Sequence, residues 1–330
     1  MSGLHIRPVV ITGCSGFVGA NLAACVVARG GRVIGVESPS ANDWRTRSMP
    51  GVELERLDLC QKSEVLAFIE RVQPQAIYNC AAYGAYPVQR AAERIFAVNL
   101  LAVHHLLEAV RRVPGFRAFV QAGSSSEYGF NCSAPAEDGV TAPDSDYAVS
   151  KVAATQLVQM YARKYGVPGF VLRLYSLYGP YEDFSRLIPT LLGRAREGGF
   201  PPLVDPDISR DFVYVADAVQ AFEAVLANAE RLTPGEVFNV GSGVKTTLSA
   251  LVQLVRELFN VKADPVWRSM PERGWDHREW FANPAKAARV IPWLSTTSMR
   301  VGLAATARWL ADNPALVAEG RKTSLLEHES

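Results

Sequence analysis

The chain has 330 residues, with 34 lysines and arginines against 33 aspartates and glutamates, so its net charge is +1. A balance this close to zero argues against nucleic-acid binding, which needs an excess of basic side chains. No apolar run approaches the roughly 20 residues that span a membrane, and residues 1–8 lack the apolar core of a signal peptide. We therefore expect a cytoplasmic protein with neither a nucleic-acid nor a membrane partner.

The cysteine and histidine patterns exclude two further kinds of site. The five cysteines are widely spaced and odd in number, and no pair has C-x-x-C spacing, so we expect reduced thiols. The five histidines include no H-x-x-x-H or H-E-x-x-H pattern. No metal site is therefore expected.

Short β-branched runs alternate with helical stretches through the first half of the chain. Strands are predicted at 9–12, 32–36, 54–58, 76–79, 116–122 and 169–174, with helices at 16–29, 90–112 and 147–165. This alternation predicts an α/β fold with a parallel, doubly wound sheet of the Rossmann type.

The pattern of predicted elements changes after Pro180, where prolines and glycines separate shorter helices and strands. Helices are predicted at 217–229, 247–259 and 301–313, and the polar residues 321–330 are expected to fray. We expect residues 1–180 to form a domain that binds the cofactor and carries the catalytic residues. Residues 181–330 would form a smaller C-terminal lobe that binds substrate, and the chain could cross between the two.

A glycine-rich turn follows the first predicted strand, where residues 12–19 read TGCSGFVG. Its glycines allow a tight turn, close approach to a pyrophosphate and packing of the next helix on the sheet. The N-terminus of that helix offers free N–H groups to phosphate oxygens. An ordinary strand-to-helix turn is the alternative, but strand, glycines and helix in this order predict dinucleotide binding. The contacts would come from Gly13, Ser15, Gly16, Phe17, Val18 and Gly19.

Acidic residues after the next two strands bear on which dinucleotide binds. Glu37 ends the second strand, about 20 residues past the glycines, where a carboxylate accepts ribose hydroxyls and repels a 2′-phosphate. It favours NAD, although Arg45 and Arg47 could hold the 2′-phosphate of NADP if their loop folds back. Asp58 is a candidate for the adenine amino group, with a helix N-cap as the alternative.

Tyr147 and Lys151 are four residues apart and so share one face of a predicted helix. An ammonium beside a phenol lowers the tyrosine pKa from about 10 toward neutrality, which suits a general acid/base in hydride transfer. An exposed helix pair is the usual alternative. Residues 123–126 read GSSS and end a strand, so a serine there could hydrogen-bond the reacting oxygen.

Further short motifs complete a pattern that covers nearly the whole chain. They are Asp58-Leu59, Asn79-Cys80-Ala81-Ala82, Val98-Asn99-Leu100, Ser124 to Gly129, Leu172-Arg173-Leu174, Tyr178-Gly179-Pro180 and Arg210 to Val215. With the glycine turn and the Tyr147/Lys151 pair, the chain resembles the extended short-chain dehydrogenases/reductases of the nucleotide-sugar epimerase/dehydratase type. The ordered set is far more specific than any one motif.

The resemblance implies roles for residues at the matching positions. Tyr147 would be the general acid/base, Lys151 its partner and a ligand of the nicotinamide ribose, and Ser124 the catalytic serine. Further cofactor contacts would come from Leu59, Ala81, Ala82, Asn99, Tyr175 and Ser176. Substrate contacts would come from Tyr83, Ser125, Ser126, Tyr178, Arg186, Arg210 and Arg273.

Arginines suit the substrate diphosphate because their fork binds phosphate oxygens bidentately. Arg210 and Arg273 are expected to hold the diphosphate, although the residues around Arg273 depart from the R-P-G-D motif of the family. Arg186 could equally be a surface side chain.

The family also implies a homodimer in which helices 90–112 and 147–165 form a four-helix bundle. Val98, Leu101, Leu106 and Val110 could line its seam or face the sheet instead.

One departure from the family narrows the reaction. Its 4,6-dehydratases carry acids just after the catalytic serine, whereas this chain has Ser125 and Ser126, with Glu127 displaced by one residue. The favoured activity is a nucleotide-sugar 4-epimerase with a transient 4-keto intermediate, and Glu37 supports it because NAD can be retained. A reductase of nucleotide 4-keto-6-deoxy sugars is the alternative. A catalytically silent dinucleotide-binding module is opposed by the intact Ser124, Tyr147 and Lys151.

Overall fold

The computed structural model describes residues 7–86, 88–270 and 278–329. At the centre of these residues is a sheet of seven parallel strands in the order β10-β6-β5-β4-β1-β2-β3. The strands are β1 (Val9–Thr12), β2 (Val33–Glu37), β3 (Val52–Arg56), β4 (Ala76–Asn79), β5 (Ala118–Ser124), β6 (Gly169–Leu174) and β10 (Val237–Val240). The inner strands β1, β4 and β5 are buried at every residue, which their mostly apolar sequences permit. The predicted doubly wound fold is confirmed.

The strand order reverses between β1 and β4, which are neighbours with Thr12 paired to Asn79. The chain proceeds from β1 to β2 and β3 on one side, and from β4 to β5 and β6 on the other. The loops that follow β1 and β4 therefore diverge at the carboxyl ends of the strands. Ligands of open α/β sheets bind at such a switch point.

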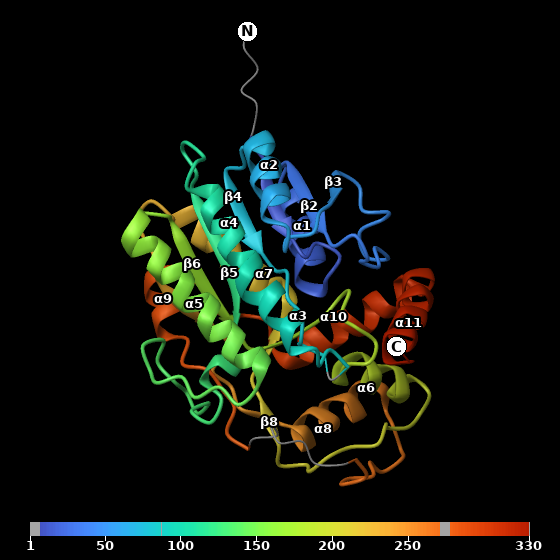
Figure 1. Ribbon diagram of the computed structural model, residues 1–330. Helices are drawn as coiled ribbons and strands as arrows, with labels where there is room; N and C mark the ends of the chain where they lie inside the picture. The colour runs from blue at the N-terminus through green and yellow to red at the C-terminus, as the bar shows by residue number, and fades with distance from the viewer. Residues whose placement is uncertain (1–6, 87, 271–277, 330) are drawn as a thin grey trace.

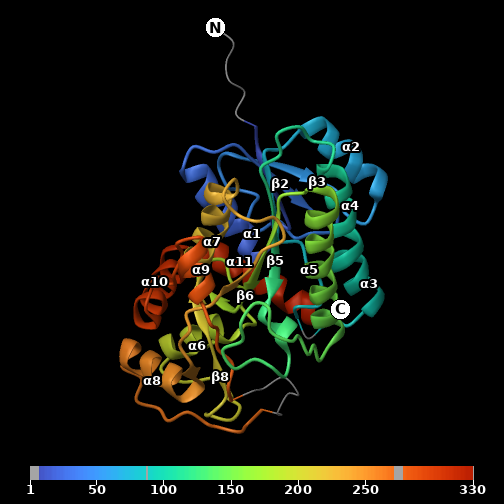
Figure 2. The same ribbon diagram turned by 90° about the vertical axis from the view of Figure 1, so that its left-hand side faces the viewer.

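Helices cover both faces of the sheet (Figures 1 and 2). One layer holds α2 (Lys62–Val72), α3 (Ala92–Phe96), α4 (Ala102–Val110) and α5 (Asp146–Tyr165). The other holds α1 (Phe17–Ala28), α7 (Val215–Asn228) and α9 (Ala285–Val290). Since α7 and β10 lie past residue 180, the chain returns to the sheet after entering the second lobe.

A π-helical turn, Ala97–Leu101, joins α3 to α4, so the single helix predicted at 90–112 carries one wider turn in its middle. The third strand is also displaced: it is found at Val52–Arg56 rather than at 54–58. Asp58 therefore lies in the turn after the strand. The boundaries of β1, β4 and β6 match the prediction.

A smaller lobe lies beyond one end of the sheet (Figure 1). It contains α6 (Leu187–Arg196), α8 (Leu248–Phe259) and α10 (Met299–Asp312), together with the strand pairs β7 (Ser176–Tyr178) with β9 (Phe212–Tyr214) and β8 (Ser209–Arg210) with β11 (Thr246–Thr247). Its core is a separate apolar cluster that includes Leu191, Leu251 and Leu303. None of the helices within the described residues has the length and apolar character needed to cross a membrane.

The chain is helical as far as Glu329, so the expected fraying is wrong for residues 321–329, and Ser330 lies outside the described residues. The helix α11 spans Pro314–Glu329 and packs on the loop after β2. Thr323 accepts a hydrogen bond of 2.9 Å from Asn42, and Glu319 forms an ion pair of 2.8 Å with Arg47. Gly320 lets the helix approach the Phe184 and Trp44 rings so closely that a Cβ there would lie 2.4 Å and 2.9 Å from them. These tertiary contacts order a segment whose composition is polar.

Candidate active site

The glycine turn after β1 forms a cradle that tolerates no side chain at two of its positions. Gly13 has a φ of +64°, and a Cβ there would lie 2.7 Å from the Ala81 nitrogen in the loop after β4. A Cβ on Gly19 would lie 2.3 Å from the Gly13 carbonyl oxygen. Gly16 precedes α1 and supplies no side-chain cap, so the first N–H groups of the helix remain for phosphate oxygens. Ser15, Phe17 and Val18 lie in this turn and the first helical residues.

Glu37 is the last residue of β2 and is buried rather than solvated. Its carboxylate accepts a hydrogen bond from the Thr46 hydroxyl, because the loop after β2 folds back over it. Arg45 donates to the carbonyl oxygens of Tyr181 at 2.7 Å and Ser15 at 3.1 Å. Arg47 forms ion pairs with Asp43 and Glu319. Both arginines therefore bind protein acceptors, and the acid at the end of β2 fits NAD better than NADP.

Asp58 and Leu59 follow β3 and line the adjacent turn. The Asp58 carboxylate accepts the Cys60 N–H at 2.9 Å, so it stabilises this turn and does not cap α2, whose N-cap is Gln61. Leu59 is buried against the apolar layer, and its carbonyl oxygen lies 3.0 Å from Nδ1 of His105.

Asn99 holds the loop after β4 from inside the π-helical turn. Its buried amide donates to the Tyr83 carbonyl at 2.8 Å and accepts the Tyr83 N–H at 2.9 Å. It also donates to the Ser150 hydroxyl at 2.9 Å, which links the loop to α5. Asn99 thus fixes the backbone beside Ala81 and Ala82, the residues expected to line the cofactor channel.

Tyr147 and Lys151 lie in the first turns of α5, which Ser145 caps through the Ala148 N–H. The Lys151 ammonium is buried, donates to the Ala122 carbonyl on β5 at 2.9 Å, and lies 5.6 Å from the centre of the Tyr147 ring. An ammonium has three donors, so anchoring by Ala122 leaves two for a ribose hydroxyl and the tyrosine. Tyr147 itself is half-buried.

Ser124 ends β5 and is the N-cap of the short 3₁₀ helix Ser125–Tyr128. Its hydroxyl oxygen accepts the Ser126 N–H at 3.1 Å, which leaves the hydroxyl proton to donate elsewhere. Its own N–H is accepted by Glu127 at 2.9 Å. The other carboxylate oxygen of Glu127 accepts from Thr155 at 2.8 Å and Arg173 at 2.9 Å. Glu127 is therefore held inside the fold by these donors, not presented to a ligand.

The expected substrate residues are spread over both lobes. Ser125 is buried and accepts the Trp280 indole N–H at 3.2 Å, and the Arg210 guanidinium lies 5.4 Å from the centre of the same indole ring. Arg186 reaches across from the N-terminus of α6 to donate to the Ala85 carbonyl at 3.0 Å. No sequence motif pointed to Trp280, because its role depends on contacts made only in the folded chain.

Four other residues were expected to contact substrate or cofactor. Tyr178 is 1% exposed and packs against Phe212, Tyr214 and Gly302 inside the second lobe, so its side chain does not reach a ligand. The Tyr175 ring is also buried, and burial raises the pKa of both hydroxyls well above the ordinary tyrosine value. Ser176 donates its N–H to the Asp211 carbonyl. Arg273 lies outside the described residues.

Two remaining residues, Tyr83 and Ser126, are half-buried. Tyr83 packs its ring under the Arg94 guanidinium, 4.6 Å from the ring centre, and Ser126 lies on the 3₁₀ helix.

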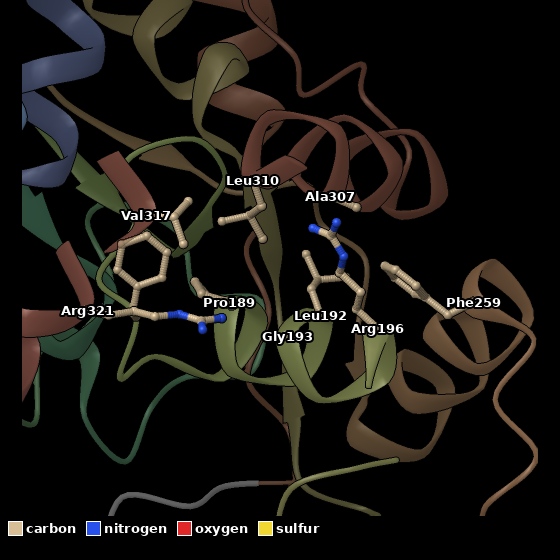
Figure 3. A pocket seen from close by; sticks show the side chains of 10 residues that line it. Pro189, Leu192, Gly193, Arg196, Phe259, Ala307, Leu310, Val317 and Arg321 are labelled. Carbon is tan, nitrogen blue, oxygen red and sulfur yellow. The ribbon is translucent and has the colours of Figure 1, made fainter. Parts of the chain in front are cut away.

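A pocket lies in the second lobe between α6, α8, α10 and α11 (Figure 3). Leu192 of α6, Leu310 of α10 and Val317 of α11 line its apolar part, and Arg196 and Arg321 also border it. The candidate catalytic and cofactor residues take no part in its lining.

A model of the NAD dependent epimerase/dehydratase family matches residues 9–241. The chain belongs to this family. It is 28% identical to UDP-glucuronate 4-epimerase 3 of Arabidopsis thaliana, over 91% of this chain and 76% of that protein. It is 26% identical to the dTDP-glucose 4,6-dehydratase of Xanthomonas campestris, over 92% and 93% of the two chains.

Solved structures show the same fold. The epimerase Mth375 of Methanothermobacter thermautotrophicus aligns with a TM-score of 0.84 at 26% identity, covering 95% of this chain and 94% of that one. The UDP-glucuronic acid 4-epimerase of Bacillus cereus, in complex with UDP-glucuronic acid and NAD, aligns with a TM-score of 0.82 at 20% identity, covering 92% and 99%. The curated relatives of this chain therefore include both a 4-epimerase and a 4,6-dehydratase.

Proposed function

We propose that this protein is an NAD-dependent nucleotide-sugar 4-epimerase. The observation that carries the proposal is that Ser124 ends β5 and Lys151, one turn after Tyr147, donates to Ala122 of the same strand. The Glu127 carboxylate is meanwhile occupied by the Ser124 N–H, Thr155 and Arg173. Together Ser124, Tyr147 and Lys151 can transfer a proton to and from the sugar and orient the sugar and the cofactor. A dehydratase needs an acid just after the catalytic serine. This chain has Ser125 and Ser126 there, and the Glu127 carboxylate does not replace that acid because protein donors bind it.

Each of the three residues has a distinct task at the sugar. The Tyr147 phenolate accepts the proton of the 4-hydroxyl and, as the phenol, returns it to the 4-oxygen after the keto sugar has rotated. Lys151, fixed by the Ala122 carbonyl, stabilises the phenolate and orients the ribose of the cofactor. The Ser124 hydroxyl donates to the 4-oxygen as it becomes a carbonyl. NAD held at this site would supply the hydride acceptor and donor for C4 of the sugar.

The contacts around the cofactor loop favour a cofactor that is retained between turnovers. Arg45 ties the glycine turn at Ser15 to the second lobe at Tyr181. Trp44 packs against Tyr181 and Phe184, with ring centres 6.4 and 5.9 Å apart, and α11 covers this loop. A retained NAD suits an epimerase, whose reaction has no net redox change, better than a reductase that must exchange its cofactor at every turnover.

The proposal is tested with the Tyr147→Phe variant on a panel of UDP- and dTDP-hexoses and hexuronates, with inversion at C4 followed by NMR. We expect kcat to fall by about 10²- to 10⁴-fold, the usual contribution of a general acid/base, with NAD affinity unchanged. Tyr165→Phe, at the far end of the same helix, is the matched control. Activity within about threefold of wild type would remove Tyr147 from the mechanism.

Mass spectrometry of the purified protein should find bound NAD. Dependence of the activity on added NADPH would instead favour the 4-keto reductase.

We further propose that the protein is a cytoplasmic homodimer that pairs through α3, α4 and α5. Leu106 and Val110 face the sheet and do not contribute to the seam, whereas Leu101 and Val149 are 53% and 42% exposed on the outer side of these helices. Burial of such apolar side chains by a second copy would stabilise the assembly. The five cysteines are all free in the structure, which suits the reducing cytoplasm.

A further inference from the structure

Trp280 connects the two ends of the candidate substrate site, although it belongs to neither the glycine turn nor the catalytic helix. Its indole N–H donates to the Ser125 hydroxyl, next in the chain to Ser124. The face of the same ring lies under the Arg210 guanidinium. Since Trp280 is only 7% exposed, these contacts are made inside the molecule and are shielded from water.

The backbone around Trp280 is pinned on two sides, so its ring position is set before any ligand binds. The Trp280 N–H donates to the Ser209 hydroxyl at 3.3 Å, and Ser209 donates to the Arg278 carbonyl at 2.7 Å. On the other side, the Phe281 N–H donates to the Cys132 carbonyl at 3.2 Å. The indole is therefore preorganised between β8 and the loop that follows the 3₁₀ helix.

The chemistry of the indole determines what Ser125 can do. An indole N–H donates and has no acceptor, so the Ser125 oxygen must be the acceptor of this bond. The Ser125 proton is then directed to a different acceptor. Because Ser125 follows the catalytic serine at the carboxyl end of β5, an oxygen of the bound sugar can be that acceptor.

We propose that Trp280 is a positioning residue, which holds Ser125 as a donor to a sugar oxygen and holds Arg210 toward the diphosphate. This inference rests on the proposed function. One rigid ring then sets the spacing between sugar and diphosphate. It also implies a substrate that carries an acceptor, a hydroxyl or a carboxylate, opposite Ser125, and discrimination against a sugar that is deoxy at that position.

Two variants separate the two roles. Trp280→Phe keeps a ring under Arg210 but removes the N–H, so we expect kcat/KM to fall by about 2- to 12-fold, as for one lost hydrogen bond, with NAD and UDP affinities unchanged. The loss should disappear in the Ser125→Ala background, because the N–H acts through Ser125. Trp280→Leu removes the ring as well, and should additionally weaken binding of UDP measured by calorimetry.

The inference is overturned if Trp280→Phe keeps the wild-type kcat/KM, or if its loss is equally large with Ser125→Ala. It is also overturned if UDP binds Trp280→Phe and Trp280→Leu equally well. A wild-type protein inactive on every nucleotide sugar would count against the proposed function instead, and the UDP comparison would still decide the role of the ring.

Discussion

The Oε2 atom of Glu127 lies 2.9 Å from Nε of Arg173, and both side chains are almost completely buried. The other carboxylate oxygen holds the backbone of Ser124. The buried ion pair is therefore linked by one hydrogen bond to the backbone of Ser124, the proposed catalytic serine. Both carboxylate oxygens of Glu127 are thus bound by protein donors, which supports the proposal that Glu127 does not replace the acid of a dehydratase.

Removal of one partner of this pair should be costly. Glu127→Ala leaves the Arg173 charge buried without its counter-ion, so the free energy of unfolding should fall by about 3–5 kcal/mol. Glu197→Ala is the matched control, since Glu197 pairs with Arg194 while both side chains are more than half exposed, and should cost less than about 1 kcal/mol. Urea denaturation measures both. Equal losses of unfolding free energy in the two variants would show that the buried Glu127–Arg173 pair stabilises the fold no more than an exposed pair does.

Gly19→Ala should damage the cofactor cradle. Its Cβ would overlap the Gly13 carbonyl oxygen, so the turn would have to shift away from the cofactor, and the Kd for NAD should rise about tenfold, which corresponds to about 1.4 kcal/mol of binding free energy. Gly199→Ala, where nothing lies within 4 Å of the added Cβ, should leave the Kd unchanged. NADH fluorescence titration measures both affinities. An unchanged Kd in Gly19→Ala would contradict the assignment of this turn.

Stability should depend on pH through Glu182. Burial raises the pKa of Glu182 from 4.5 to about 8, partly offset by Arg186 and by the Gly179 N–H. Between these pH values the folded protein holds a proton that the unfolded chain has released, so the free energy of unfolding falls as pH rises from about 4.5 to 8.

Glu182→Gln removes this titration. The variant should match wild type near pH 4 and be more stable by about 1–3 kcal/mol at pH 8.5, because no carboxylate has to be buried there. Thermal unfolding across the pH series measures the difference, with the exposed Glu197→Gln as control. A variant whose stability parallels wild type at every pH would rule out this titration.

The dimer proposal predicts that Leu101→Glu dissociates the assembly, since a charge would be buried in the seam. Light scattering should give twice the chain mass of 36.0 kDa for wild type and the chain mass for the variant. Val244→Glu, equally exposed but in the second lobe, should remain dimeric. Wild-type protein at 36.0 kDa across the concentration range would defeat the proposal.

Local sequence predicts the strands best where burial is continuous. Val9–Thr12 and Ala76–Asn79 are buried at every residue, and both were predicted with their boundaries. The edge strand Val52–Arg56 is largely exposed and carries glutamates at alternate positions, so its apolar signal is weak and its predicted boundary is two residues late. Displacement of Glu127 was also predictable by counting from Ser124.

Other features depend on partners far away in the sequence. Nothing local to residues 314–329 signals a docked helix, because its order comes from Gly320 meeting Trp44 and Thr323 meeting Asn42. Trp280 meets Ser125 across 155 positions of chain. The three partners of Glu127 likewise become visible only when β5, β6 and α5 are brought together.

The π-helical turn at Ala97–Leu101 makes the number of residues between α3 and α4 critical. Such a turn contains one residue more than a regular helical turn, and one residue corresponds to about 100° of rotation. Deletion of a single residue between 97 and 101 would allow an unbroken α-helix, but would swing α3 around its axis relative to α4. Ile95 would leave its contact with Gly84, and Asn99 would lose Tyr83. Insertions and deletions in this helix are therefore constrained more tightly than point substitutions on its surface.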